Sequence, residues 1–214
     1  PSGALPLVHT LVNSSRAQPN RPSSAGARLR CLMDPSVSRT GVVAFFASDC
    51  TTSSAASRPL DDGARMYRSK RASEHTLHMP DATAPNAVVA GVYIAQLPAA
   101  GGSWHPAGEA PLTVVADSTG FVPGSASVTF TAFSSPVASD SLVAFVASTS
   151  EGTLGIFTYD LADHALRQLC DTNTAAPGGG GATFSDFPYP PSVSGRTVVF
   201  YGAAGGSASG VYAH

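Results

Sequence analysis

The chain has 214 residues, enough to bury a substantial core. Only 12% of them are charged, Lys70 is the single lysine, and Gly, Ser, Ala and Pro are abundant, which suits short strands joined by tight turns. No apolar run is long enough to span a bilayer and no intact signal peptide is present. We therefore expect no membrane span, and we expect that any targeting segment has been removed or lies outside this chain.

The first expected element is a strand at Leu5–Asn13. The run LVNSSRAQP, which begins at Leu11, resembles LCDTNTAAP at Leu169–Pro177, and the chain finishes on a Gly-aromatic strand with no strand after it. We therefore expect Leu5–Asn13 to complete the last sheet beside Gly210–Tyr212, because closure of this kind hides sheet edges. Asn13 also begins an N-glycosylation sequon, Asn-Ser-Ser.

The next element is a motif that occurs three times along the chain. The copies read DPSVSRTGVVAFFAS from Asp34, SSPVASDSLVAFVAS from Ser134 and PPSVSGRTVVFYGA from Pro190. Each consists of a proline, a Ser-rich turn and a strand, and a Gly-aromatic strand follows each copy, at Gly91, Gly155 and Gly210. Self-similarity on this scale indicates a repeat architecture.

The first repeat, residues 34–128, carries two insertions, at 51–88 and 98–109, that add about 36 and ten residues relative to the second repeat. Ten of the twelve basic residues lie at or before Arg71 against four acids, about +6, whereas two basic residues and ten acids follow it, about −8. This polarity favours one face suited to an anionic partner, and a solvated loop is the alternative. The predicted partner-binding residues are Arg58, Arg65, Met66, Tyr67, Arg68, Lys70 and Arg71.

The second repeat, residues 129–183, contains the complete unit. Its four strand-like runs are Thr129–Phe133, Leu142–Ser148, Gly155–Leu161 and Ala165–Asp171. Each run is rich in β-branched and aromatic residues and is bounded by turn residues, and no window has a sustained helical period. Four antiparallel strands per repeat of this length describe a propeller blade better than a solenoid rung.

The third repeat, residues 184–214, lacks the fourth run. We therefore predict an all-β, β-propeller-like array of four-stranded antiparallel blades in a single domain, residues 1–214, in which 1–33 supply the closing strand and an inter-blade loop. We expect Phe45, Phe145 and Phe200 at equivalent buried positions. About three blades are fewer than the usual four to eight, so the chain is a fragment of a longer propeller, completes a ring with other chains, or forms an atypical ring. We favour a fragment.

Two groups of side chains are candidates for a disulfide bond or for a bound calcium ion. Cys31 and Cys50 flank neighbouring expected strands, so they form a disulfide or are small buried hydrophobes. The loops at Asp117 and Asp171 offer oxygen atoms to calcium, but the same residues form turns, which we favour. We expect no other cofactor and no metal at the remaining candidate ligands, Glu74, His75, His78 and Asp81.

The motif resembles the tandem repeats called NxxGxxAF, which occur in secreted or surface-anchored bacterial proteins and some algal ones. In that register the first copy has Ser38, Gly41, Ala44 and Phe45, with serine in place of the asparagine. The second copy keeps Ala144 and Phe145, and the third keeps Phe200. The resemblance implies a propeller-like fold in a secreted, cell-surface or organelle-lumen setting, and it implies no catalytic residues.

Motifs of enzyme chemistry are largely missing from the sequence. There is no CxxC pair, HExxH, Walker-type loop or Gly-x-Ser-x-Gly elbow. The run Gly178–Gly181 leads into a strand, so it lacks the helix that a phosphate cradle needs. We therefore favour a non-catalytic structural or binding module that contacts a protein or a polysaccharide, with no nucleic-acid partner. The alternative is a propeller-type hydrolase or lyase acting on glycans, which would need two positioned carboxylates.

Overall fold

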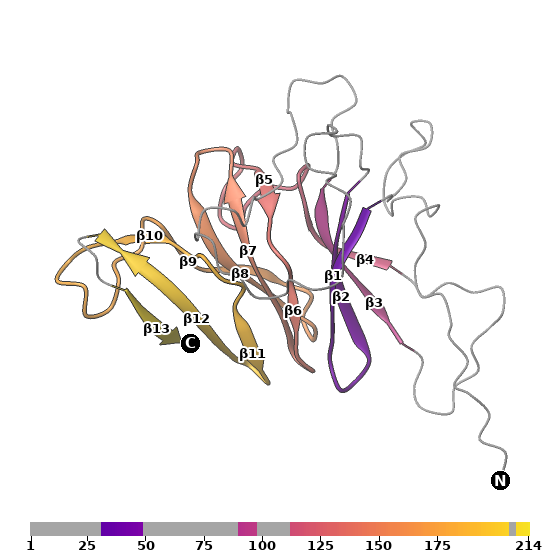
Figure 1. Ribbon diagram of the computed structural model, residues 1–214. Coiled ribbons are helices and arrows are strands. Elements are labelled where there is room, and N and C mark those ends of the chain that lie inside the picture. Colours follow the sequence, from indigo (N-terminus) through magenta and orange to yellow (C-terminus); the bar gives the residue numbers. More distant parts are fainter. Residues whose placement is uncertain (1–30, 49–89, 98–111, 206–208) are drawn as a thin grey trace, which may run out of the picture.

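The computed structural model describes residues 31–48, 90–97, 112–205 and 209–214. These ranges contain no α-helix and form three antiparallel sheets that lie side by side in chain order (Figure 1). The prediction of an all-β chain built from sheets of about four strands is confirmed.

In each sheet the chain follows an antiparallel meander. Sheet 1 has the order β1 (Cys31–Val37), β2 (Val42–Ser48), β3 (Gly91–Gln96) and β4 (Leu112–Asp117). Sheet 2 has the order β5 (Phe130–Phe133), β7 (Leu142–Thr149), β8 (Leu154–Asp160) and β9 (Leu166–Asp171), and β6 (Val137–Ala138) also pairs with β7. In sheet 3, β12 (Thr197–Ala204) pairs with β10 (Phe184–Asp186), β11 (Ser192–Ser194) and β13 (Ser209–Ala213).

The recurring proline interrupts the first strand of each sheet. In sheet 1, β1 bulges between Met33 and Ser36, and Asp34 there has a positive φ of 53°. In sheets 2 and 3 the first strand is split into two pieces, with Pro136 between β5 and β6 and Pro191 between β10 and β11. Proline has no N–H to donate to the ladder, so the pairing breaks at these positions.

The strand register establishes which residues are equivalent in the three sheets. The second and third strands pair as Phe45 with Tyr93, Phe145 with Phe157, and Phe200 with Tyr212. The phenylalanines of the second strands are 5%, 0% and 6% exposed. Their predicted equivalence and burial are confirmed.

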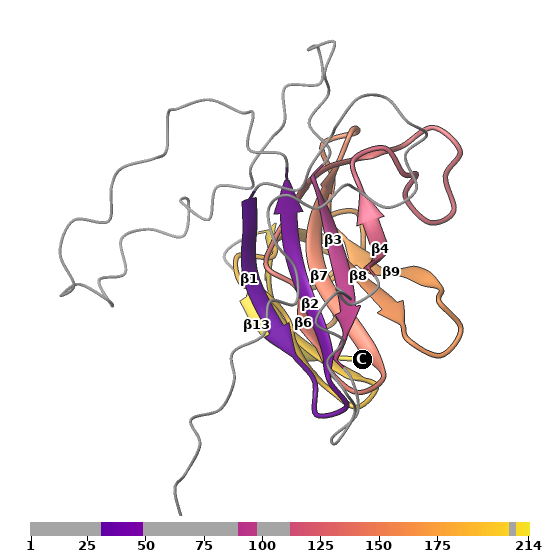
Figure 2. The same ribbon diagram turned by 90° about the vertical axis from the view of Figure 1, so that its right-hand side faces the viewer.

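The sheets stack face to face and in one direction. We call the face that points to the preceding sheet in chain order upstream, and the other face downstream. The downstream face of sheet 1, with Phe46 and Val92, packs on the upstream face of sheet 2, with Phe145 and Phe157. The downstream face of sheet 2 packs in turn on the upstream face of sheet 3, which includes Phe200. Figure 2 shows sheet 1 in front of the other two sheets.

Both insertions replace hairpin turns of sheet 1. Ala47 pairs with Gly91 at the β2–β3 connection, and Ala95 pairs with Leu112 at the β3–β4 connection. The connecting segments, 49–89 and 98–111, lie outside the described residues, as do residues 1–30 and therefore the predicted closing strand Leu5–Asn13.

Candidate functional site

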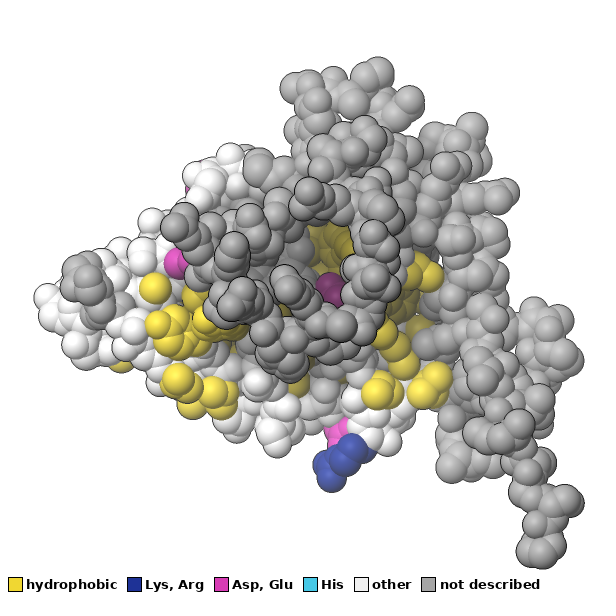
Figure 3. Space-filling model, viewed as in Figure 1, with side chains coloured by type: hydrophobic (Ala, Val, Ile, Leu, Met, Phe, Trp, Pro, Cys, Tyr) yellow, Lys and Arg dark blue, Asp and Glu magenta, His cyan; other side chains and the backbone are white. Residues whose placement is uncertain are grey.

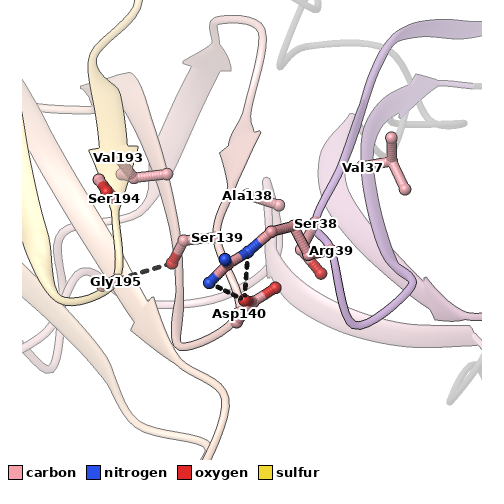
Figure 4. A pocket seen from close by; sticks show the side chains of 9 residues that line it. All are labelled: Val37, Ser38, Arg39, Ala138, Ser139, Asp140, Val193, Ser194 and Gly195. Atoms are coloured by element: carbon pink, nitrogen blue, oxygen red, sulfur yellow. Dashed lines mark hydrogen bonds and ion pairs between the residues drawn. The ribbon is translucent and has the colours of Figure 1, made fainter.

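Three equivalent turns, one from each sheet, meet around a pocket of about 250 Å³ (Figure 4). They are the β1–β2, β6–β7 and β11–β12 turns, which join the first and second strands of each sheet. The lining residues are Val37, Ser38, Arg39, Ala138, Ser139, Asp140, Val193, Ser194 and Gly195. The three copies of the proline- and serine-containing part of the repeat therefore form the pocket together.

Serine shapes two of these turns through hydrogen bonds to backbone N–H groups. Ser38 Oγ accepts from the N–H of Val42 at 3.1 Å, and Ser139 Oγ accepts from the N–H of Leu142 at 3.0 Å. Such local side-chain bonds explain why serine recurs in the motif. Ser139 Oγ also donates to the backbone oxygen of Gly195 at 2.7 Å, which ties the turn of sheet 2 to that of sheet 3.

Asp140 ties the turn of sheet 2 to that of sheet 1. Its Oδ1 accepts from the Thr40 N–H at 2.9 Å. Its Oδ2 accepts from Arg39 Nε at 3.0 Å, as Figure 4 shows. The Thr40 N–H and the Arg39 guanidinium lower the pKa of the Asp140 carboxyl. The Arg39 side chain is 93% exposed, so this ion pair contributes little to stability. Both carboxylate oxygens of Asp140 are thus engaged within the protein.

A second ion pair joins sheets 2 and 3 beside the pocket. Asp160, at the end of β8, is 3% exposed and accepts from the Arg196 guanidinium and from the Ala162 N–H. These hydrogen bonds, led by that of Arg196, lower the pKa of Asp160 to about 2. Asp160 is therefore a charged acceptor at neutral pH and not a proton donor.

The Asp160 pKa predicts loss of stability in acid. The folded-state pKa of about 2 lies below the ordinary value of 3.8, so the carboxylate contributes stability above about pH 4 that disappears as pH falls through 2. In Asp160→Asn, the urea midpoint should be lower than that of the wild-type chain at pH 7 and should depend less on pH between 4 and 2. Glu151→Gln, an exposed acid in the β7–β8 turn, is the control and should follow the wild-type curve. Identical pH curves for wild type and Asp160→Asn would contradict this assignment.

Two further carboxylates, Asp117 and Asp171, hydrogen-bond within their own turns. Asp117 Oδ1 accepts from the Thr119 N–H at 2.8 Å, and Asp171 Oδ1 accepts from the Asn173 N–H at 3.0 Å. Both side chains stabilise their turns, which supports the turn interpretation of these loops over calcium binding. Within the described ranges, no group of three or more His, Cys, Asp or Glu side chains gathers to hold a metal ion.

Among the described residues that line the pocket, Asp140 is the one acid, whereas a glycosidase requires two. That chemistry needs one carboxylic acid with a raised pKa and a second carboxylate facing it. The described acids with shifted pKa values, Asp140, Asp160 and Asp163, are all shifted downward by hydrogen bonds from neighbouring arginines or backbone N–H groups. Among the described residues, every buried side-chain nitrogen and oxygen has a hydrogen-bond partner, so none of these atoms needs a ligand to satisfy it.

Most of the predicted site residues lie outside the described residues. These are the seven predicted partner-binding residues of the first insertion, together with Asn13 and Cys50. Cys31 is the first residue of β1 and pairs with Ser48 through the backbone. Cys170 is a buried free thiol on β9, and burial raises its pKa to about 12, so it behaves as a small hydrophobe.

The pocket was not predicted from the sequence, although the triplicated Ser-rich turn that forms it was recognised. Comparisons with protein-family models, curated proteins and solved structures gave no match. Within the described part of the chain, no helix is both long and apolar enough to cross a membrane.

Proposed function

We propose that the three sheets are blades of a β-propeller-like array and that the chain is a non-catalytic structural or binding module. The main support is the arrangement of the sheets: equivalent faces stack in one direction, and the turns between their first and second strands meet at one pocket. In a propeller the first strands of the blades surround a central channel. The pocket then lies at one mouth of that channel.

The binding role is assigned to the first insertion and not to the pocket. Arg39 and Asp140 in the pocket are bonded to each other, whereas the predicted basic cluster, with Arg65 and Arg68, stands in a long connection between two buried strands. Loops carried on a rigid sheet scaffold commonly make binding contacts. The partner is a protein or polysaccharide with acidic groups, in a secreted, cell-surface or organelle-lumen setting that the motif resemblance favours.

The hairpin of sheet 2 provides a replacement for the first insertion. Ser48 corresponds to Ser148 and Gly91 to Gly155, because Ala47 and Ala147 pair with those glycines. In sheet 2, six residues, Thr149–Leu154, fill this connection, and residues 49–90 fill it in sheet 1. Replacing residues 49–90 with the sequence TSEGTL should keep the fold, because both connections start and end at equivalent strand positions.

Binding of this variant to immobilised polygalacturonate, an acidic polysaccharide, tests the role of the insertion. At physiological salt the wild-type chain should bind and the loop-replaced chain should not. Each exposed charge pair contributes on the order of 0–1 kcal/mol, so several pairs must act together. Arg39→Gln, which removes an exposed cation at the pocket, is the control and should bind like wild type. Equal binding by the loop-replaced chain would refute the role, and loss of its circular dichroism spectrum would show that the insertion is structural.

A further inference from the structure

The pocket formed by the three turns suits a different ligand from the acidic partner proposed for the first insertion. Arg39 and Asp140 are the charged residues among those that line the pocket, and they form an ion pair with each other. An acidic ligand would meet the Asp140 carboxylate beside the Arg39 guanidinium. Figure 3 shows basic and acidic side chains adjoining at the lower edge of the molecule, the edge at which Figure 1 draws the turn between β1 and β2. The pocket therefore favours a ligand without a net charge.

The ion pair leaves part of its hydrogen-bonding capacity unused. Arg39 Nε and Nη2 lie 3.0 and 2.9 Å from Asp140 Oδ2. A guanidinium carries five N–H groups, so the Nη1 group and the second N–H of Nη2 have no acceptor among the described residues. Asp140 Oδ1 accepts from the Thr40 N–H, and a carboxylate oxygen has two lone pairs, so this oxygen can accept one more hydrogen bond. A donor and an acceptor thus lie next to each other.

Hydroxyl groups match this arrangement. A hydroxyl both donates and accepts hydrogen bonds, whereas a carboxylate only accepts and an ammonium group only donates. Of two neighbouring hydroxyls on a ligand, one can accept from the Arg39 guanidinium while the other donates to the Asp140 carboxylate. Hydrogen bonds with a charged partner are stronger than those between neutral groups. Neighbouring hydroxyls on a ring are the common feature of sugars.

Small apolar side chains form another part of the lining. Val37, Ala138 and Val193 occupy equivalent positions in the three sheets by strand register. Val37 is 62% exposed, and the other two residues are half-buried. Figure 4 shows the Val193 side chain directed from β11 toward the other two turns. A sugar ring carries C–H groups on its faces, and contact between these groups and the valines removes apolar area from water.

The size of the pocket and the ties around it suit a small ligand. Hydrogen bonds join the β6–β7 turn to the β1–β2 turn through Asp140 and to the β11–β12 turn through Ser139. These bonds hold the three turns in place before a ligand arrives. The pocket volume of about 250 Å³ is below the roughly 300–1,000 Å³ of pockets that hold drug-sized ligands. A single sugar unit is therefore a suitable occupant.

We propose that this pocket binds a neutral sugar unit, with neighbouring hydroxyls bonded to Arg39 and Asp140 and the ring against Val37 and Val193. The site binds the sugar and does not cleave it, since Asp140 is the one acid among the described residues of the lining. This inference does not depend on what the first insertion binds, because the two sites take ligands of different charge.

The first test is a titration of the full chain with the methyl glycosides of glucose, galactose and mannose, followed by NMR of isotope-labelled protein. The amide signals of Thr40, Asp140 and Gly195 should move with at least one of these sugars, with a dissociation constant on the order of 1–10 mM. Methyl glucuronide and methyl glucosaminide should bind at least about tenfold more weakly, because one charge of the ion pair repels each of them. If no neutral sugar moved these signals, or if a charged sugar bound equally well, the proposal would be overturned.

Two arginine variants separate this site from the first insertion. Arg39→Gln removes the charged donor, so binding of the neutral sugar should weaken by about tenfold, while binding to polygalacturonate stays as in wild type. Arg167→Gln removes another exposed arginine that is paired with an aspartate, Asp163, and it should bind the sugar like wild type. The loop-replaced chain should lose polygalacturonate and keep the sugar. Unchanged sugar binding in Arg39→Gln, or an equal loss in both arginine variants, would refute the site.

Asp140→Asn tests the charge argument directly. The asparagine amide keeps an oxygen for the Thr40 N–H but leaves the Arg39 charge without its partner. Binding of the neutral sugar should therefore weaken and binding of methyl glucuronide should strengthen, so that the preference for the neutral sugar is lost. A merely structural change at the turn would move both affinities in the same direction. An unchanged preference, whether both affinities stay or both fall, would contradict the assignment of this pocket to an uncharged ligand.

Discussion

Phe157→Ala is expected to lower the free energy of unfolding by about 3–5 kcal/mol, as large-to-small changes of a buried aromatic residue do. Phe157 is 0% exposed and lies in the interface between sheets 1 and 2. Its ring stacks on Phe145 at 5.8 Å and meets the edge of Phe130 at 5.1 Å. Truncation therefore leaves a cavity that the two neighbouring rings can fill only by leaving their own positions.

Equilibrium urea unfolding followed by circular dichroism measures this effect. Phe121→Ala is the control, because the side chain of Phe121 is 56% exposed between β4 and β5. Its free energy of unfolding should stay within about 0.5 kcal/mol of wild type, as is usual for surface positions. If both variants lost the same amount, packing between sheets 1 and 2 would not be the main source of stability at Phe157.

The repeats made the strand arrangement predictable. A single strand-like run such as Leu142–Ser148 only suggests a strand, but three copies at matching spacings also align the residues of one sheet with those of the next. That alignment correctly placed the buried phenylalanines of β2, β7 and β12 and the site of the first insertion, between β2 and β3. Counting the extra residues of the first repeat located both insertions correctly. The reason is that the insertions replace hairpin turns and leave the strand pairing intact.

The split first strands were missed because proline was interpreted only as the start of a turn. Pro136 and Pro191 are almost fully buried, each between two short strands that pair with the same neighbour. A run such as Val137–Ala138 is too short for a periodic pattern to reveal. Pairing with β7 gives Val137–Ala138 its strand conformation, and the local sequence does not reveal that pairing.

The pocket was missed for a different reason. Asp140 bonds to Arg39 and Thr40, about one hundred positions earlier in the chain, and Ser139 bonds to Gly195 in the following sheet. These contacts depend on how the sheets stack, whereas the sequence pattern reports only the conformation of each turn. Ser38 and Ser139 each accept a hydrogen bond within their own turn. That the two turns lie next to each other follows only from the stacking of the sheets.

Gly91→Ala should also destabilise the fold, by about 1–3 kcal/mol, the usual cost of forcing extra volume into a packed region. Gly91 is buried and pairs with Asp117 next to a register shift between Val92 and Tyr93. An added Cβ would lie 2.6 Å from the backbone oxygen of Ala116 and 3.0 Å from the Asp117 Cβ. Because the first of these atoms belongs to the backbone of β4, no side-chain rotation relieves the clash, and β4 itself must move.

Gly120→Ala is the matched control for this clash. Its nearest atom would be the backbone oxygen of Asp117 at 3.5 Å, which is an ordinary contact, and the backbone of Gly120 does not have a positive φ. The urea midpoint of Gly120→Ala should therefore equal or exceed that of wild type, while that of Gly91→Ala falls. Equal stability of the two variants would mean that β4 shifts at little cost. The recurrence of glycine at the start of each third strand would then need a reason other than the close approach of the fourth strand.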